Sequence, residues 1–416
     1  MKVNYNTGFS PEMADMNQVN SRLALVLAAL LGSTAAHAEA PPVTPYADIR
    51  YRLETVDRDG LADQAAASTL RIRAGVRTAE LHGFSAVIEG EAIAVLGAAT
   101  YNDTVNGKLG YPVVADPSDV LLNQAYLRWR PASSLEVTAG RQAVNLDNQR
   151  WIGSVGWRQN DQTLDAVRVT ARPVKGASLD YIHAWRVNRV FGPDSPQGIW
   201  RDTNIHGIRA AYAIKGVGTL SAYGYWLDVP ASPASSNRTL GARIAGELPI
   251  GGKSAVLYAA EYARQHDHGS NPRRFALDYW LIEPGVKVGS VTVKAGYERL
   301  EGNGTVGLQT PLATLHAFNG WADKFLTTPA SGLRDVYLDA SYKVPGQGAL
   351  SGLVLRAAWH DFGSTRGGIA YSQEWNALAS YPLGKRFTLT AKLAQYDAQT
   401  FATDTTKLWF QVEAKF

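Results

Sequence analysis

The stretch that decides the fold is the C-terminal segment Leu408-Trp-Phe-Gln-Val-Glu-Ala-Lys-Phe416 (LWFQVEAKF), in which apolar and polar residues alternate. Leu408, Phe410 and Val412 fall on one parity, and the polar residues fall on the other, which is the period of a β-strand with two unlike faces. The end of a soluble strand frays and has no need of an aromatic residue. In a closed membrane barrel the terminal strand pairs with the first, and an aromatic residue at its end lies at the lipid–water boundary. The segment therefore predicts the closing strand of a membrane barrel.

The N-terminal region has the pattern of a secretory signal peptide. Arg22 is followed by the apolar run 23–31 (LALVLAALL) and then by Ala36-His37-Ala38. The apolar run is too short for a helix across the hydrocarbon core, which needs about 20 residues. We expect cleavage after Ala38, so that residues 1–38 form the signal peptide and residues 39–416 form a single barrel domain of an exported protein.

The composition fits the same class. The chain has no cysteine in 416 residues, which excludes disulfides, thiolate metal sites and thiol catalysis. Its 39 glycines and its 19 tyrosines and 11 tryptophans suit short strands joined by turns. The mean hydropathy of −0.17 suits a barrel whose membrane signal is diluted by polar lumen residues. An array of soluble β-sandwiches is the competing interpretation, but it would need domain boundaries, and the sequence contains no linker.

The alternation recurs along the whole mature chain. It predicts an all-β, antiparallel, up-and-down transmembrane β-barrel of 18 strands, with 16 as the alternative count. The predicted strands lie at 47–54, 70–77, 83–95, 120–130, 135–143, 164–172, 177–187, 204–214, 218–229, 237–248, 254–265, 275–288, 291–300, 334–343, 352–361, 371–382, 386–396 and 407–416.

The predicted connections alternate in length. Short turns with Gly or Pro, such as those at 130–134 and 249–252, alternate with long polar loops, such as those at 96–119, 144–163 and 301–333. Outer-membrane barrels have short periplasmic turns and longer extracellular loops. We therefore expect the protein in the outer membrane of a Gram-negative cell, with both termini on the periplasmic side.

One parity of the predicted strands is rich in arginine and is assigned to the lumen. On that parity arginine outnumbers the acids two to one, so we expect a surplus of positive charge that attracts anions. A structural role in Arg–Glu pairs inside the barrel is the alternative for each residue. The predicted pore-lining residues are Arg50, Arg52, Arg71, Arg73, Arg77, Arg128, Arg130, Arg168, Arg172, Arg209, Arg243 and Arg356.

The most distinctive motif is the stretch 140–168 (GRQAVNLDNQRWIGSVGWRQNDQTLDAVR), which joins two predicted strands. It resembles the signature of the alginate-export (AlgE-like) outer-membrane family in the segments GRQ, DNQR, GWRQN and QTLDA, although Leu164 stands where that family more often has Phe. The resemblance implies an 18-stranded barrel that conducts a polyanionic polysaccharide. Residues of this loop that could form a constriction or contact a substrate are Asp147, Asn148, Gln149, Arg150, Trp157, Arg158, Gln159 and Asn160. Packing of the loop against the wall is the alternative role for them.

The sequence predicts a passive outer-membrane channel for anions, and the resemblance favours export of an alginate-like polysaccharide. A general or sugar-acid uptake porin is the first alternative, and a structural or adhesive barrel without flux is the second. The expected partners are outer-membrane lipid and lipopolysaccharide, the barrel-assembly machinery through the strand that ends at Phe416, and an anionic polysaccharide or sugar acid.

The sequence gives little support for an enzyme or for a nucleic-acid-binding protein. The sequence has no G-x-S-x-G or H-E-x-x-H motif, so we expect no catalytic residues and no cofactor. His266-Asp267-His268 could bind a metal, but a lone H-x-H in a polar loop is more often a solvated tip, and we expect no metal site. The arginines are spread over many strands rather than clustered, which argues against a nucleic-acid partner despite a pI near 9.0.

Overall fold

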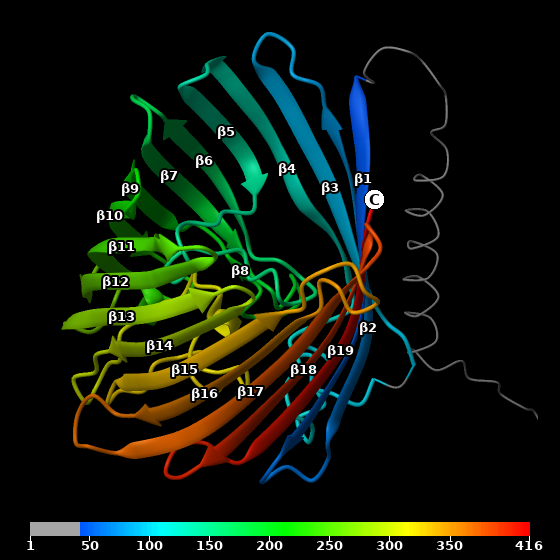
Figure 1. Cartoon of the computed structure of the whole chain (residues 1–416), viewed down its shortest axis with the longest axis vertical. Coiled ribbons are helices and arrows are strands. Elements are labelled where there is room, and N and C mark those ends of the chain that lie inside the picture. The colour runs from blue at the N-terminus through cyan, green and yellow to red at the C-terminus, as the bar shows by residue number, and fades with distance from the viewer. Residues whose placement is uncertain (1–41, 98) are drawn as a thin grey trace, which may run out of the picture.

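The chain forms a closed antiparallel β-barrel. This description rests on a computed structural model and covers residues 42–97 and 99–416; the predicted signal peptide lies outside the described residues. The strands follow one another around the barrel in chain order, and β1 pairs with both β2 and β19 (Figure 1). Among the described residues, no helix is long and apolar enough to cross a membrane.

Nineteen strands and two short 3-10 helices are present in this part of the chain. Eighteen strands form the barrel wall, as predicted, while the two-residue β8 pairs only with the end of β7 at the rim. The elements are β1 (Val43–Arg58), β2 (Ala65–Thr78), β3 (Phe84–Val95), β4 (Asp119–Ala132), β5 (Leu135–Gln142), β6 (Thr163–Ala171), β7 (Ala177–Asn188), β8 (Ile199–Trp200), β9 (Asn204–Ile214), β10 (Gly218–Asp228), η1 (Pro233–Ser235), β11 (Asn237–Gly251), β12 (Ser254–Asp267), β13 (Ala276–Val288), β14 (Val291–Leu300), η2 (Leu315–Ala317), β15 (Leu333–Lys343), β16 (Val354–Gly363), β17 (Ala370–Leu383), β18 (Phe387–Ala398) and β19 (Thr405–Lys415).

The barrel closes where the C-terminal segment was expected to close it. The register of β1 and β19 runs from Asp48 opposite Lys415 to Arg58 opposite Thr405. Phe416 continues this ladder, because its N–H donates to the carbonyl of Ala47 at 2.9 Å and its carbonyl accepts from the N–H of Ala47 at 3.2 Å. The terminal aromatic residue therefore lies at the seam between the first and last strands.

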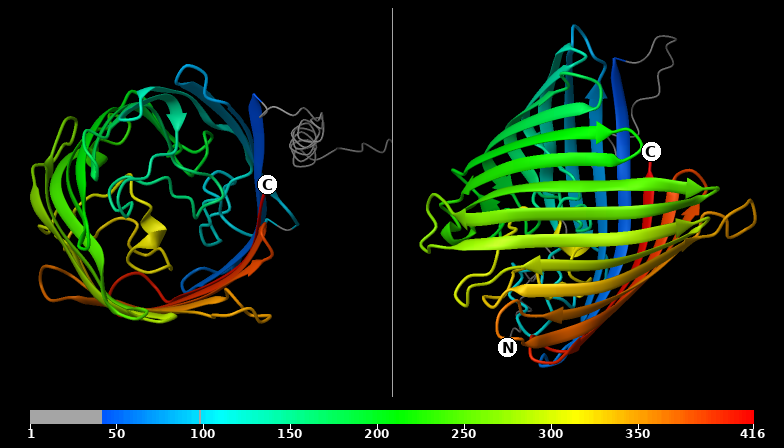
Figure 2. Two further views of the ribbon diagram at one scale, coloured as in Figure 1. Left: turned by 45° about the horizontal axis from the view of Figure 1, so that its top comes forward. Right: turned by 60° about the vertical axis from the view of Figure 1, so that its left-hand side comes forward.

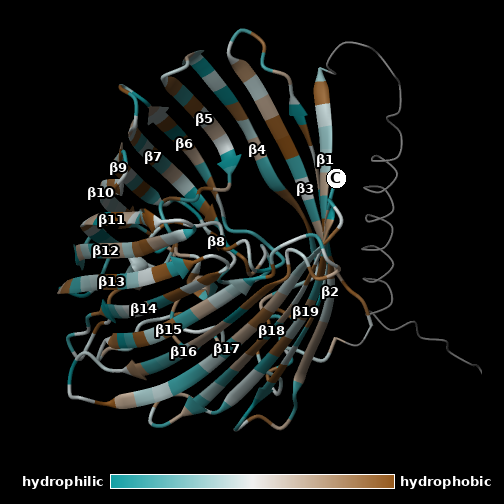
Figure 3. Ribbon diagram, viewed as in Figure 1, coloured by the Kyte–Doolittle hydropathy of each residue, from teal (hydrophilic) through white to brown (hydrophobic). Residues whose placement is uncertain are grey.

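Hydrophilic and hydrophobic residues alternate along much of the barrel wall (Figure 3), and neighbouring side chains face opposite sides of it. On β19, Phe410 is 55% exposed and faces outward, whereas its neighbour Trp409 is fully buried toward the lumen. Exposed aromatic side chains gather near both ends of the wall. Phe84 and Trp129 stack at the end with short turns, and Tyr262 and Trp280 pack together toward the end with long loops. Two aromatic belts flanking an apolar band are typical of a membrane-spanning barrel.

The connections alternate in length as predicted, with one difference. The β15–β16 connection lies among the short turns but is long, because residues 348–353 form an additional hydrogen-bonded turn, and it spans residues 344–353. We call the two ends of the barrel the turn end and the loop end.

Candidate functional site: a constricted channel with a cationic mouth

Two long loops fold into the lumen. They are the β5–β6 loop (143–162) and the β14–β15 loop (301–332), and Figure 2 shows them inside the ring of strands. Trp151 Nε1 donates to Glu261 on β12 at 2.7 Å, and the N–H of Ala322 donates to Glu374 on β17 at 2.8 Å. Both acceptors are buried on inward-facing positions of the wall. The β5–β6 loop, in which the constriction residues were predicted, therefore lies inside the barrel together with a second loop.

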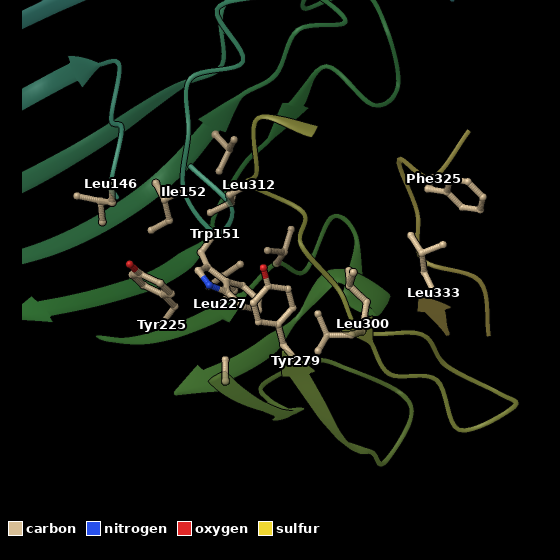
Figure 4. Close-up of a cluster of buried hydrophobic side chains, with 14 of the residues drawn as sticks. Leu146, Trp151, Ile152, Tyr225, Leu227, Tyr279, Leu300, Leu312, Phe325 and Leu333 are labelled. Carbon is tan, nitrogen blue, oxygen red and sulfur yellow. The ribbon is translucent and has the colours of Figure 1, made fainter. Parts of the chain in front are cut away.

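Apolar packing holds the two loops against one side of the wall. Trp151 and Ile152 of the β5–β6 loop lie close to Leu312 of the β14–β15 loop, and they pack on Tyr225 and Tyr279 of the wall (Figure 4). Trp151 meets the ring of Tyr279 edge-on, with 5.2 Å between ring centroids. An apolar cluster inside a lumen lined mostly by polar groups gives these loops a hydrophobic reason to fold inward.

On the opposite side, arginines of β1 hold the backbone of the β5–β6 loop. Arg50 Nη1 donates to the carbonyls of Gly156 at 3.1 Å and Arg158 at 3.2 Å, and Arg52 donates to the carbonyl of Trp157. The guanidinium of Arg52 also lies 4.1 Å from the ring centre of Trp157. Two of the predicted pore-lining arginines thus bind the loop rather than open water.

Arg158 is the centre of a buried ion cluster. Its guanidinium lies 3.1 Å from Glu54 on β1, 3.0 Å from Asp323 on the β14–β15 loop and 3.9 Å from Asp116 on the β3–β4 loop. All four side chains are almost completely buried. Arg158 therefore joins three loops (β3–β4, β5–β6 and β14–β15) and the first strand at one point.

Lys392 on β18 makes the corresponding contact from the other wall. Its ammonium lies 3.8 Å from the ring centre of Trp157 and 3.9 Å from that of Trp321, and it donates to His316 Nε2 at 2.7 Å. Burial lowers the pKa of His316 to about 3, although Asp323 opposes the shift. The neutral imidazole therefore accepts from Lys392 through Nε2 and donates from Nδ1 to Asp323 at 2.8 Å. This arrangement fixes the tautomer of His316.

Three side chains contact the carboxylate of Asp323: His316, Arg158 and Lys407. Burial alone would raise its pKa, but His316, Lys407 and Arg158 hold the pKa of Asp323 well below its usual range. Lys407 on β19 reaches Asp323 at 3.0 Å. The carboxylate is therefore ionised at neutral pH and anchors the β14–β15 loop to the wall.

The twelve wall arginines are largely neutralised, which corrects the predicted surplus. Ten of them have a carboxylate within 4.0 Å, and among the described residues only Arg77 and Arg172 have none. The sequence count missed acids that come from loops, such as Asp116 and Asp161, and acids of the strands themselves, such as Glu413 and Asp339. The pairs are Arg50–Glu413, Arg52–Asp116, Arg71–Asp48, Arg73–Glu91 and Arg73–Asp161, Arg128–Glu136, Arg130–Glu136, Arg168–Asp180, Arg209–Asp147, Arg243–Glu261 and Arg356–Asp339.

The remaining predicted loop residues hold the loop in place. Asp147 pairs with Arg209 on β9, and Arg150 pairs with Glu298 on β14 at 2.9 Å. The other side-chain contacts are made by Asn148 with the N–H of Arg150, by Gln149 with Thr314, by Gln159 with Thr69 on β2, and by Asn160 with the carbonyl of Arg189.

A cavity of about 520 Å³ lies at the loop end, between the inward-folded loops and the rim. We call it the mouth cavity. Five connections contribute to it: β3–β4, β5–β6, β7–β9, β14–β15 and β18–β19. Much of its lining is apolar and includes Val113, Phe191, Leu315, Leu326 and Phe401. Its charged lining residues are Arg58, Arg158, Arg189, Lys324, Lys407 and Asp323, with His316 beside them.

Three of these cations have no carboxylate of the described residues within 4.0 Å: Arg58, Arg189 and Lys324. Lys324 Nζ donates to Thr405 Oγ1 at 2.6 Å, and Arg189 lies 4.3 Å from the ring centre of Trp200. Burial lowers the pKa of Arg189 to about 10. Burial, with Arg58 and Lys407 nearby, lowers the pKa of Lys324 to about 8. A basic side chain whose pKa is lowered by burial is stabilised in its charged form when an anion binds beside it.

The sequence interpretation missed these three residues. Arg58 ends a strand, and Arg189 and Lys324 lie in loops, so no alternation identifies the face that they occupy. A search for basic residues flanked by aromatic ones would have found Arg189, which precedes Phe191.

A closed barrel with an outward apolar band, two aromatic belts and a lumen narrowed by its own loops is a channel of the outer membrane. Comparison with known proteins gives the family. The family model for Gram-negative porins matches residues 24–400, and the chain belongs to that family. It is therefore an outer-membrane channel and not an enzyme.

Solved structures share the fold of this chain. The crystal structure of Pseudomonas aeruginosa OpdL has a TM-score of 0.70 at 17% identity, covering 90% of this chain and 98% of that chain. Acinetobacter baumannii OccAB3 has a TM-score of 0.71 at 13% identity, covering 90% and 99%. P. aeruginosa OpdK, solved with vanillate, has a TM-score of 0.69 at 14% identity, covering 89% and 98%. No curated protein matches the chain. The resemblance to the alginate-export family gains no support from these relatives.

Proposed function

We propose that the protein is an uptake porin for small organic anions and that the mouth cavity is their first binding site. The observation that carries the proposal is the excess of cations over acids in that cavity, above all Arg58, Arg189 and Lys324, which have no carboxylate beside them. Because low-dielectric walls focus the field of these charges, anions gather there before they enter the constriction.

The size and lining of the mouth cavity favour a small solute with an apolar body. A volume of about 520 Å³ lies within the range of roughly 300–1,000 Å³ typical of small-molecule sites. Apolar walls beside cationic groups suit an aromatic or aliphatic carboxylate. The related OpdK was solved with vanillate, which is an aromatic carboxylate.

Export of an acidic polysaccharide has less support. The arginines expected to form a polyanion conduit are mostly paired with carboxylates, and the motif residues 147–150 and 157–160 hold the β5–β6 loop across the lumen. A polymer would require these loops to move aside together.

The test is the ion selectivity of the purified protein in planar bilayers across a KCl gradient. We expect preference for chloride over potassium, and at least a threefold smaller preference in the Arg58→Gln/Arg189→Gln/Lys324→Gln variant. At about 7 Å in water each unit charge contributes roughly 0.6 kcal/mol, and 1 M salt should suppress the effect. Arg201→Gln is the matched control, because Arg201 is exposed in the same loop as Arg189 but does not line the mouth cavity.

Substrate class is tested in the same bilayers. Benzoate should reduce the chloride current at millimolar concentration, whereas benzyl alcohol, which is similar in size but neutral, should not. Preference for potassium in the wild type, or equal selectivity in the triple variant, would contradict the proposal. Block by a uronate oligomer without any effect of benzoate would favour polysaccharide export, and absence of any conductance would favour the structural barrel.

A further inference from the structure

A second polar cavity lies on the barrel at the loop end of β11 and β12. Its volume is about 340 Å³, and it is lined by Arg238, His266, Asp267, His268, Gly269, Asn271 and Arg274. It shares no lining residue with the mouth cavity. We infer that it binds the phosphate group of an outer-leaflet lipid.

Arg238 and His266 belong to the outward face of the wall. They lie directly opposite each other in the β11–β12 register. Leu240 and Tyr262, which share their parity, are 52% and 38% exposed on the lipid side. Gln265, on the other parity, is buried and donates to the carbonyl of Gln309 in an inward-folded loop. The Arg238–His266 pair therefore faces the membrane and not the channel.

The pair lies at the outer edge of the lipid head groups. Tyr262 and Trp280 are opposite each other on β12 and β13, with ring centroids 4.4 Å apart, and they mark the aromatic belt at the loop end. His266 is four residues beyond Tyr262, which is about 14 Å along a strand and about 10 Å along the membrane normal at a tilt near 45°. The head-group region begins at the belt and is roughly 5–8 Å thick on each side of the hydrocarbon core. Arg238 and His266 thus lie just beyond its depth, and the long side chain of Arg238 can reach back into it.

The cavity has donors that the protein itself does not satisfy. No carboxylate of the described residues lies within 4.0 Å of the Arg238 guanidinium. Asp267 is the one acid in the lining, and its oxygens already accept from Arg274 at 2.8 Å and from the N–H of Phe275 at 3.0 Å. A forked guanidinium beside two imidazoles matches a phosphate group, which offers several acceptor oxygens to donors arranged around it.

An ion pair on the outward wall between the aromatic belt and the cavity also suits the level of lipid head groups. Arg264, one row nearer the belt, pairs with Asp278 at 2.9 Å and remains half exposed toward the membrane. A lipid placed here sets its acyl chains against the apolar band and its phosphate in the cavity. A free phosphate ion would contact only the cavity, because it has no acyl chains to pack against the apolar band of the wall.

The test is native mass spectrometry of the detergent-purified protein titrated with lipid A, a bisphosphorylated and acylated glucosamine disaccharide. We expect one tightly bound lipid, and at least tenfold weaker binding to the Arg238→Gln/His266→Gln variant. The dephosphorylated lipid should also bind at least tenfold more weakly to the wild type. Arg366→Gln is the control, because Arg366 is an exposed loop arginine at the same end of the barrel and does not line this cavity.

Two further measurements keep the result interpretable. Heat-modifiable gel mobility verifies that the double variant is folded, and its unchanged ion selectivity separates this site from the mouth cavity. Equal lipid binding by the double variant, or equal binding of the dephosphorylated lipid, would overturn the inference. Displacement of lipid A by inorganic phosphate at low millimolar concentration would assign the cavity to the free ion instead and would likewise overturn it.

Discussion

Lys392 on β18 lies with its ammonium 3.8 Å from the ring centre of Trp157 in the middle of the β5–β6 loop. The same ammonium contacts Trp321 and His316 of the β14–β15 loop. One wall side chain therefore holds both loops that narrow the lumen. Because these loops occupy the passage, we expect their attachment to Lys392 to influence how much of the lumen is open.

Replacing Lys392 by Met should loosen the constriction. Cation–π contacts contribute about 0.5–2 kcal/mol each, and loss of the ammonium leaves His316 Nε2 without its donor. We expect larger and noisier single-channel currents in Lys392→Met, while the barrel itself stays folded because Met has a similar volume. Lys385→Met, in the exposed β17–β18 turn, should conduct like the wild type. Identical current traces for the two variants would show that Lys392 does not anchor the loops.

The anion preference should fall as the pH rises through about 8, which is the lowered pKa of Lys324. Lys324 is charged below this pH and neutral above it, so the mouth cavity loses one positive charge between pH 7 and 9. The pKa values of His316, about 3, and Arg189, about 10, place their titration outside this window. Reversal potentials measured from pH 6 to 9 should show the step in the wild type.

Two variants assign this step to Lys324. Lys324→Arg should keep the preference at pH 9, and Lys324→Gln should show a low preference at every pH. A step of the same size in Lys324→Gln would place the titrating group elsewhere.

Replacing Arg158 by Met should destabilise the protein strongly. Glu54, Asp116 and Asp323 would be left close together in a buried site without their shared guanidinium. Removing one partner of a buried ion pair costs about 3–5 kcal/mol. The effect should appear as a lower unfolding temperature by tryptophan fluorescence, with Arg158→Lys intermediate because it keeps the charge but loses the fork. Arg201→Met serves as the exposed control, and equal unfolding temperatures for both Met variants would contradict the cluster's role.

Changes at the seam should reduce the amount of folded barrel. Deleting Phe416 removes its two backbone hydrogen bonds to Ala47 and its contact with Phe387, whose ring centroid is 6.4 Å away. Val412→Lys places a charge on the lipid face, which costs roughly 2–4 kcal/mol at the bilayer midplane. Outer-membrane levels and heat-modifiable mobility report both effects, and Val412→Leu is the control. Wild-type levels in both variants would show that this strand does not limit assembly.

The strands could be predicted from sequence because each has a local signature. Alternation in the segment 408–416 and in the first strand fixed which residues face lipid, and their register in β1 and β19 agrees with it. The count of eighteen wall strands and the order of short and long connections followed from the same pattern.

The site could be predicted only in part, because its contacts join residues far apart in the chain. The motif at 140–168 marked the constriction loop, but the acids that neutralise Arg52 and Arg158 come from residues 116 and 323, which follow no periodicity. The second inward loop carries no motif of its own. The unpaired cations of the mouth cavity come together only when five connections meet.

The pairing of β1 with β19 also sets the order in which the protein can fold. Arg50 and Glu413, which meet across this seam, are separated by 363 positions in the chain. Every other neighbouring pair of wall strands can form locally, but this one must wait until all the others are in place, and such long-range pairing is slow. Until then the growing sheet has two open edges that can pair with other chains. Closure of the seam should therefore be a slow step, and it is also the step that removes both open edges of the sheet.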